Sequence, residues 1–454
     1  MLQETFDLSV ILKQKSDLTF REKIIYVCSL SIPGILAQVS SIVMQYIDAA
    51  MAGSLGENAS AAIGLVASAT WILGSLYSSF CLGFSVLVSQ AVGKGNSRLA
   101  KCILKESILW GIVFSVALTI PAALMSFKIP LWLGGKSVIQ KDAAMYFLIF
   151  ALSTPFFLFV CLFSGILQAA GEMKVPSVLN ILMCFLDVFF NYVFIFILKY
   201  GVLGAALGSA VSAFSVFLIM SWYVFFKFGY FKKCGKVRRK DFPSSVKSAV
   251  KIAVPVAVEK CAFTSALVAV TKMIAPLGET ALAANSFAVT AESLCYMPAY
   301  GIQEASTTLT GQSFGAQRKD LARSFSFITM FFGAAIMALT GSIMFFICPF
   351  VFKFLTPVES IQNLSVEILR LELFAEPFFG ASIVASGALR GTGDVFVPGI
   401  LNLISLWIVR ITLSFLLAPV MGLKGIWLAM AVELCFRGII LTMRLWFKYR
   451  NGGL

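Results

Sequence analysis

Three polar residues stand in stretches of this chain that are otherwise almost entirely apolar. Asp48 lies in the segment QYIDAAMAG, and Asp187 and Asn191 lie in the segment LDVFFN. Residues four apart in an α-helix share one face, so Asp187 and Asn191 can act together. A carboxylate at the centre of a membrane helix costs roughly 2.5–3.5 kcal/mol on insertion scales, so its presence calls for a partner or a function.

These residues can form either a cation site or a structural contact. With the hydroxyl groups of Ser164 and Ser209, the side chains of Asp48, Asp187 and Asn191 could supply oxygen ligands for Na⁺, or the two carboxyl groups could share one proton. The alternative is that the two acids only hydrogen-bond helices together. Because the chain contains no histidine, proton transfer near neutral pH would fall to carboxyl groups. Apart from Na⁺ or H⁺ as the coupling ion, no cofactor is expected.

The second half of the chain has its own charged residues in apolar surroundings. Glu259 follows Pro255 by four residues and is the candidate cation ligand of this half, although the adjacent Lys260 could neutralise it. Arg410 and Arg437 also lie within apolar segments, where we expect them to pair with an acid or to extend toward the membrane surface. The remaining acids in apolar context are Glu292, Glu376 and Glu433.

The composition places these residues in a membrane protein. Of 454 residues, 59% are apolar and 13% are charged, against about 45–50% and about 25% in soluble proteins. Segments of about 20 apolar residues are long enough to cross a bilayer as helices. We therefore predict an all-α membrane protein with twelve transmembrane helices, at 24–52, 61–91, 107–125, 144–169, 176–198, 204–226, 252–276, 283–312, 324–346, 371–389, 398–418 and 425–447.

An internal repeat organises the predicted helices. Residue pairs separated by 222 positions recur along the whole chain, among them Pro33 with Pro255 and Gln90 with Gln312. Both prolines lie inside predicted helices, where proline removes a hydrogen bond and introduces a kink. Each half has an even number of spans, so both halves enter the membrane from the same side. The sequence thus predicts two six-helix bundles related as a parallel repeat.

The acids of the first half are not repeated in the second. Asp48 and Asp187 correspond to Val270 and Val409 at the same offset. A carboxyl pair present in one half only is difficult to explain as scaffold shared by both halves. This asymmetry favours a cation site confined to the first bundle.

The distribution of basic residues predicts the topology. Lys and Arg concentrate in the even-numbered connections and at the C-terminal end, so both termini should be cytoplasmic, and the net charge of +14 indicates a membrane surface rather than nucleic acid. No removable signal peptide is apparent. The ten cysteines form no CxxC pair. The expected organisation is a cytoplasmic tail (1–23), an N-lobe (24–226), a basic cytoplasmic linker (227–251), a C-lobe (252–447) and a second cytoplasmic tail (448–454).

Several motifs together resemble the multidrug and toxic compound extrusion (MATE) family. They are IDAAMAGSLG at 47–56, VSQAVGKGN at 88–96, MPAYGIQEASTTLTGQSFGA at 297–316 and GALRGTGDVFVP at 387–398. The resemblance implies two bundles in a V shape around a central cavity. It also implies secondary active export of organic cations or other xenobiotics, driven by Na⁺ or H⁺ entry through alternating access. We expect a functional monomer in the inner or plasma membrane.

The resemblance also assigns individual residues. The family's first-helix Asp matches Asp48, and its Pro-x-x-x-Glu motif in the seventh helix matches Pro255 and Glu259. One feature departs from the family, whose fifth helix usually reads Asn-x-x-x-Asp, whereas this chain reads Asp187-x-x-x-Asn191. The exchange moves the carboxylate by about 5 Å, one helical pitch.

Other classes fit the sequence less well. A lipid-linked oligosaccharide flippase of the same superfamily would line its cavity with Arg and Lys, and interior positive charges are few here. A major-facilitator carrier would show a basic signature after the second span, where this chain reads GKGNSRLAK. A membrane-embedded enzyme needs a nucleophile and base or metal ligands, for which a chain without histidine offers few options. A channel stays open as an alternative from the sequence, and uphill export that collapses with the ion gradient would exclude both a channel and an enzyme.

Overall fold

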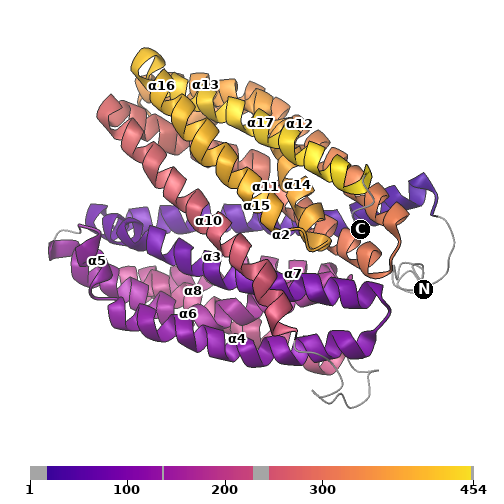
Figure 1. Ribbon diagram of the computed structural model, residues 1–454. Helices are drawn as coiled ribbons and strands as arrows, with labels where there is room; N and C mark the ends of the chain where they lie inside the picture. The colour runs from indigo at the N-terminus through magenta and orange to yellow at the C-terminus, as the bar shows by residue number, and fades with distance from the viewer. Residues whose placement is uncertain (1–17, 135–136, 229–244, 451–454) are drawn as a thin grey trace. The chain divides into compact units, whose positions relative to one another are not determined.

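The computed structural model describes residues 18–134, 137–228 and 245–450, and all regular secondary structure in them is helical (Figure 1). Residues 1–17 of the expected N-terminal tail, 229–244 of the expected linker and 451–454 of the expected C-terminal tail lie outside the described residues. Each of the twelve predicted spans corresponds to a helical segment. The prediction of an all-helical membrane protein is therefore confirmed.

The chain divides into two compact units. One unit comprises Ser40–Ala257, and the other comprises the residues up to Val39 together with those from Val258 onward. Helices α2 (Phe20–Ser54) and α10 (Val246–Ile274) each run from one unit into the other. The division therefore falls inside two helices and does not coincide with the connection between the repeats.

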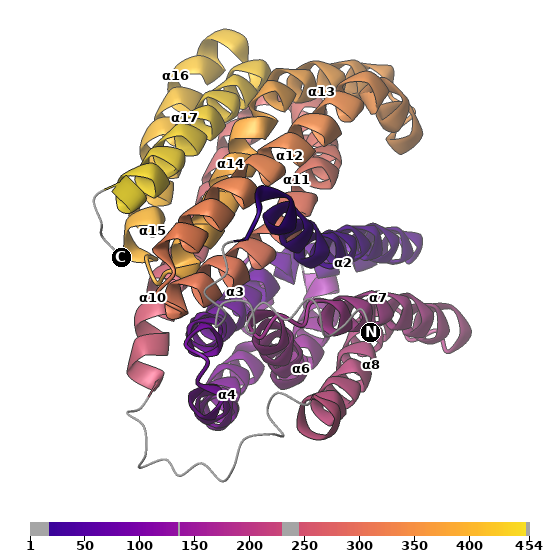
Figure 2. The same ribbon diagram turned by 90° about the vertical axis from the view of Figure 1, so that its right-hand side faces the viewer.

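The Ser40–Ala257 unit is built from long helices around an apolar core. Helices α7 and α8 pack side by side, and both pack against α6 (Figure 2). Fully buried side chains such as Phe84, Leu158 and Ile166 fill its interior. Besides its parts of α2 and α10, the unit contains α3 (Glu57–Gly93), α4 (Ser97–Met125), α5 (Ile129–Trp132), α6 (Ser137–Ala169), α7 (Lys174–Tyr192), η1 (Val193–Ile197), α8 (Val202–Trp222) and η2 (Tyr223–Lys227).

The second unit has the same kind of construction. Its largest core cluster lies between α11, α12, α13, α14 and α17 and includes Trp427, Met344 and Phe352. Besides its parts of α2 and α10, it contains η4 (Ala275–Leu277), α11 (Glu279–Gly315), α12 (Lys319–Leu355), α13 (Glu359–Glu372), η5 (Leu373–Ala375), α14 (Glu376–Gly391), α15 (Phe396–Ile404), η6 (Ser405–Arg410), α16 (Ile411–Met421) and α17 (Leu423–Arg450).

The internal repeat is visible in the helix boundaries. Helix α3 extends from Glu57 to Gly93, and α11 extends from Glu279 to Gly315, so both ends keep the offset of 222 residues. The residues that precede these helices, Gly56 and Gly278, have φ angles of 100° and 101°. Left-handed backbone of this kind favours glycine, so the repeat preserves the turn as well as the helix.

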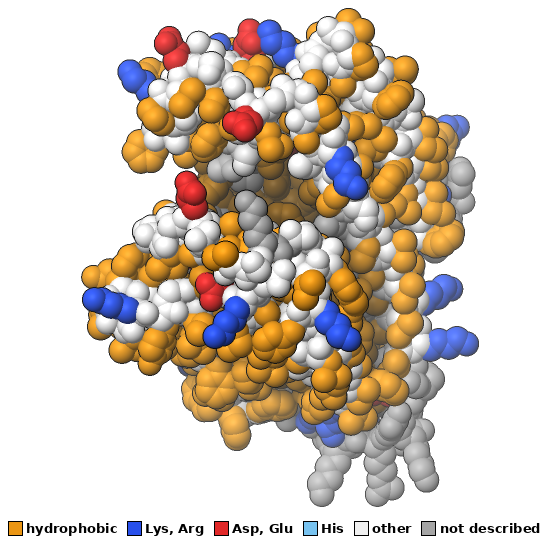
Figure 3. Space-filling model, turned by 90° about the vertical axis from the view of Figure 1, so that its left-hand side faces the viewer, with side chains coloured by type: hydrophobic (Ala, Val, Ile, Leu, Met, Phe, Trp, Pro, Cys, Tyr) orange, Lys and Arg blue, Asp and Glu red, His pale blue; other side chains and the backbone are white. Residues whose placement is uncertain are grey.

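Length and hydropathy support membrane insertion. Ten helical segments of the described chain are long and apolar enough to cross a membrane. The two other expected spans correspond to α11 and α14, of which α11 carries Glu292 and Glu304 and α14 has 16 residues. Large apolar side chains such as Trp71 and Phe354 are exposed on the surface, and apolar side chains dominate the face shown in Figure 3. Such a surface fits contact with lipid.

Candidate functional site

Helices α2 and α7 bring the three polar residues of the first half together. Asp48 lies near the end of α2, and Asp187 and Asn191 lie one turn apart on α7, all within the Ser40–Ala257 unit. Helix α7 continues directly into the π-helical turn η1. Such turns are rare and occur frequently at functional sites.

The amide of Asn191 connects the two acids. Its Nδ2 atom donates hydrogen bonds to Asp48 Oδ1 at 3.0 Å and to Asp187 Oδ2 at 2.9 Å. The carboxyl groups of Asp48 and Asp187 also lie close enough to interact directly. Two carboxyl groups held this close together in a buried site are most stable when one of them carries a proton. The arrangement therefore has the chemistry of a proton-sharing acid pair.

Burial makes this pair significant. Asp187 and Asn191 are each 2% exposed, and Asp48 is half-buried. No Lys or Arg forms an ion pair with either acid among the described residues. A buried charge without a partner is strongly unfavourable. A cation must therefore neutralise the pair, and either a proton or a metal ion would do so.

Helix α8 completes the site through hydroxyl groups. The side chain of Ser209, a residue predicted for this site, lies close enough to interact with Asp187. The hydroxyl of Ser212 lies 3.3 Å from Asp187 Oδ1 and 2.9 Å from the carbonyl oxygen of Ser209 and can donate to either, and Ser212 was not among the residues predicted for this site. The signal was available, because Ser212 lies one helical turn after Ser209. Tyr146 of α6 and Cys184 of α7 also lie close enough to interact electrostatically with both acids.

A glycine of α8 makes room for Asn191. A Cβ atom at Gly208 would contact the side-chain oxygen of Asn191 and lie 2.8 Å from its backbone nitrogen. Such a distance is much shorter than any ordinary contact, so only glycine fits here. The close approach fixes Asn191 with its nitrogen facing the acids, and its Oδ1 atom has no hydrogen-bond partner among the described residues.

The structure does not join Ser164 to this group. Ser164 is buried in α6, and its hydroxyl has no hydrogen-bond partner among the described residues. Helix α6 ends at Ala169 and α7 begins at Lys174.

In the second half, Glu259 already has a positively charged partner. Arg390 Nη2 lies 3.0 Å from Glu259 Oε1 and 3.1 Å from Oε2, and Asn402 Nδ2 donates to Oε1 at 2.7 Å. Sequence reasoning considered the adjacent Lys260 and did not identify Arg390, which lies in the GALRG segment of α14. The nearest charge in space could not be found from sequence neighbours.

The two interior arginines interact with interior acids, as expected. Arg437 forms a buried ion pair with Glu433, with 2.9 Å between Nε and Oε1, and the hydroxyl of Ser405 donates to Glu433 at 2.5 Å. Arg410 lies 2.7 Å from the sulfur of Met430 through its Nη2 atom. Arg410 also interacts electrostatically with Glu433 and Glu292.

The two prolines lie inside the helices in which they were predicted. Pro33 lies within α2 and Pro255 lies within α10. Next to Pro33, the backbone of Gly34 packs so closely against Gly301 of α11 that a Cβ at Gly34 would lie 2.9 Å from the Gly301 carbonyl oxygen. The first part of α2 is therefore fixed against α11 where the proline interrupts the helix.

A duplicated bundle of membrane helices with buried acids in its interior is typical of a secondary transporter. The family model MatE matches residues 33–193 and again 255–416. The two matches begin at Pro33 and Pro255, the first pair of the repeat. The chain belongs to the MatE family of multidrug and toxic compound extrusion transporters, which are not enzymes.

Known proteins resemble the whole chain. A probable multidrug resistance protein NorM from Thermotoga maritima is 26% identical over 431 residues, covering 92% of this chain and 90% of the relative. A multidrug resistance MATE family transporter in an outward-facing conformation has a TM-score of 0.88 at 19% identity and covers 94% of this chain and 96% of that chain. A MATE transporter from Vibrio cholerae has a TM-score of 0.88 at 16% identity, with 95% and 97% covered. These structures share the fold.

Proposed function

We propose that this transporter exports drug-like organic cations and other xenobiotics in exchange for a cation that enters the cell. Relatives that match nearly its full length are described as probable multidrug resistance proteins from Thermotoga maritima and several Bacillus species. Export of this kind requires a binding site for the coupling cation. The buried acids of the Ser40–Ala257 unit are the residues best suited to that role.

One observation carries the assignment of the coupling site. Asp48 and Asp187 accept hydrogen bonds from the same amide nitrogen, which holds their carboxyl groups close together. Because Asn191 presents its N–H group to the acids, it contributes no oxygen ligand for a metal ion in this arrangement. This geometry supports a proton over Na⁺ as the coupling ion. Among the described residues, no group of three or more His, Cys, Asp or Glu is arranged to hold a metal.

The site can act on transport by alternating access. A cation shifts the balance between two conformations only if it binds them with different affinity. The hydroxyls of α8 and the amide of α7 hold Asp187, and α2 holds Asp48. Loss of the shared proton would leave two negative charges in contact, so α2 would move away from α7. Proton binding would bring the helices together again, and this repacking would drive release of the drug.

The proposed setting of the protein follows its charge distribution. We place both termini on the cytoplasmic side of the inner or plasma membrane, because basic residues concentrate in the connections of one side. The proposed N-lobe (24–226) and C-lobe (252–447) then form the two alternating halves, and the monomer is the proposed functional unit.

Efflux from proteoliposomes tests the proposal. Ethidium export is measured with the purified chain under a pH gradient alone and under a Na⁺ gradient alone. We expect export with the pH gradient only, and its loss in Asp48→Asn and Asp187→Asn. Asp142→Asn is the matched control, because Asp142 is an exposed acid on α6 of the same unit. Undiminished ion-driven export by both site variants would refute the assignment, and export driven by Na⁺ alone would replace the proton with Na⁺.

A further inference from the structure

The second unit contains two carboxyl groups that the proposed coupling site does not use. Glu372 is the last residue of α13, and Glu376 is the first residue of α14, so they lie four residues apart across the short turn η5. Both side chains are 0% exposed. All four of their carboxyl oxygens lack a hydrogen-bond partner among the described residues.

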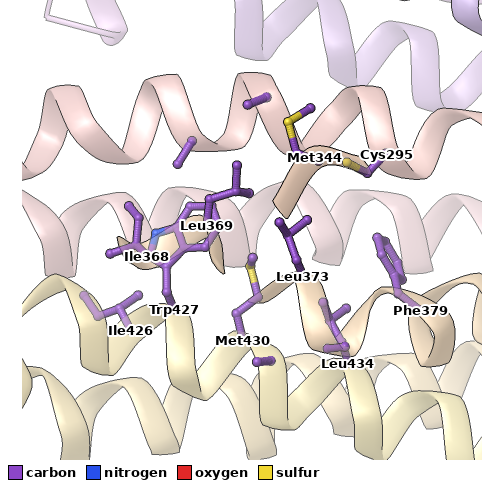
Figure 4. Close-up of a cluster of buried hydrophobic side chains, with 14 of the residues drawn as sticks. Cys295, Met344, Ile368, Leu369, Leu373, Phe379, Ile426, Trp427, Met430 and Leu434 are labelled. Carbon is purple, nitrogen blue, oxygen red and sulfur yellow. The ribbon is translucent and has the colours of Figure 1, made fainter. Parts of the chain in front are cut away.

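These carboxyl groups are embedded in the apolar core. Leu373, which lies between them in the sequence, belongs to the buried cluster with Cys295, Met344 and Phe379 (Figure 4). On the α12 side, a Cβ atom at Gly341 would lie 3.3 Å from Cβ and Cγ of Glu376. The backbone of α12 is therefore packed directly against this acid.

The surrounding charges do not compensate the two acids. Arg437 is paired with Glu433. Arg410 and Arg437 also attract Glu292, which lies on α11. Arg410 also attracts Glu372. Two arginines are thus shared among the four acids Glu292, Glu372, Glu376 and Glu433, and no cation forms an ion pair with Glu372 or Glu376 among the described residues. Two ionised carboxylates in contact with an apolar core would be strongly unfavourable.

In the internal repeat, these acids lie on the counterpart of a helix that borders the first site. Helix α6 (Ser137–Ala169) corresponds to residues 359–391, which contain α13 and α14, at the offset of 222. Glu372 and Glu376 correspond to Phe150 and Thr154. These two residues lie one and two turns after Tyr146, the α6 residue that interacts with Asp48 and Asp187. This helix therefore borders a pair of buried acids in the first repeat and carries such a pair in the second.

We propose that Glu372 and Glu376 form a second proton-binding site, in which both carboxyl groups carry a proton in this conformation and exchange it during transport. The ligand is the proton itself, because an unpaired neutral acid is the form compatible with this apolar environment. This site is separate from the Asp48–Asp187 pair. Only its link to transport rests on the proposed function. The titratable and charged groups that interact with the two acids are Glu292 and Cys295 of α11, Arg410 of η6 and Cys435 of α17.

Infrared spectroscopy tests the protonation state directly. The intact chain is produced with ¹³C-labelled glutamate, and the C=O stretching band of protonated carboxyl groups is recorded at pH 7 in detergent. We expect a protonated-acid band that shifts with the label and that is lost in Glu372→Gln/Glu376→Gln. The exposed Glu359 of α13 offers the matched control, because Glu359→Gln should leave the band unchanged. Absence of a labelled acid band from the unaltered protein, or its survival in the double variant, overturns the proposal.

Ethidium transport tests whether the protons are exchanged. Glutamine keeps the size of the side chain but cannot release a proton, so the double variant should bind ethidium normally and lose pH-driven efflux by about tenfold or more. Wild-type efflux in the double variant, with ethidium binding retained as proof of folding, would also overturn the proposal. The efflux of the Asp48→Asn and Asp187→Asn variants tests the first-half coupling site separately. Failure of the proposed function can therefore be distinguished from failure of the second proton site.

Discussion

Arg390 holds both carboxylate oxygens of Glu259, at 3.0 and 3.1 Å from a single guanidinium nitrogen. The side chains are 11% and 14% exposed, so the pair is largely buried. The charge of Glu259 is thereby compensated within the protein, in contrast to the unpaired acids of the first half. We therefore infer that Glu259 joins α10 to α14 and is not itself a ligand of the coupling cation.

The first prediction concerns the stability of this pair. Glu259→Gln should lower the free energy of unfolding by about 3–5 kcal/mol, because it leaves the guanidinium of Arg390 buried without a counter-charge. The double variant Glu259→Gln/Arg390→Gln should recover part of that loss, since neither charge then remains. Thermal unfolding in detergent measures both, and the coupling energy follows from the double-mutant cycle. Additive effects of the two substitutions would show that the pair does not contribute as a unit.

The contrast between these acids shows what the sequence could predict. Helical segments and the repeat follow from hydropathy and from equal offsets, which are properties of the chain alone. The Asp48–Asp187–Asn191 group was also predictable, because few polar residues interrupt the apolar segments. Arg390 was not, since it lies 131 residues from Glu259, and only packing of α10 against α14 decides that they meet. Glu372 was likewise missed, because its burial depends on the helices around it.

The order of the two polar residues on α7 leads to a second prediction. The exchange variant Asp187→Asn/Asn191→Asp restores the order usual in the family. Because Asp48, Asp187 and Asn191 contact one another, the exchange keeps two acids and one amide within the same group. We expect pH-driven ethidium efflux to remain within about tenfold of wild type, whereas each single substitution abolishes it. Loss of efflux in the exchange variant, with normal folding, would show that the depth of the carboxylate is essential.

Ser212 provides a third prediction, on a residue that supports the acid pair. Its hydroxyl can donate either to Asp187 Oδ1 at 3.3 Å or to the carbonyl oxygen of Ser209 at 2.9 Å. Ser212→Ala should reduce efflux a few-fold, consistent with the loss of one hydrogen bond of about 0.5–1.5 kcal/mol. Ser215→Ala is the control, because Ser215 lies on the same helix and its hydroxyl bonds only the carbonyl of Val211 among the contacts that the structure describes. Equal effects of both substitutions would indicate a general weakening of α8 instead.

A fourth prediction tests the close approach of α8 to α7. Gly208→Ala would place a methyl group 2.8 Å from the backbone nitrogen of Asn191 and against its side-chain oxygen. The two helices must then separate, which should lower the free energy of unfolding by about 1–3 kcal/mol, as overpacking typically does. Separation also carries Asn191 away from the acids, so pH-driven efflux should fall more than stability alone would explain.

Gly64→Ala is the matched control for this substitution. Gly64 lies inside α3, and a Cβ atom there would have nothing within 4 Å. Since alanine favours a helix over glycine by about 1 kcal/mol, this control should be neutral or slightly stabilising. Thermal unfolding and ethidium efflux are measured on both variants in the same lipid. If Gly208→Ala behaves like Gly64→Ala in both assays, close packing of α8 does not position Asn191, and the amide must be held by its hydrogen bonds to Asp48 and Asp187 alone.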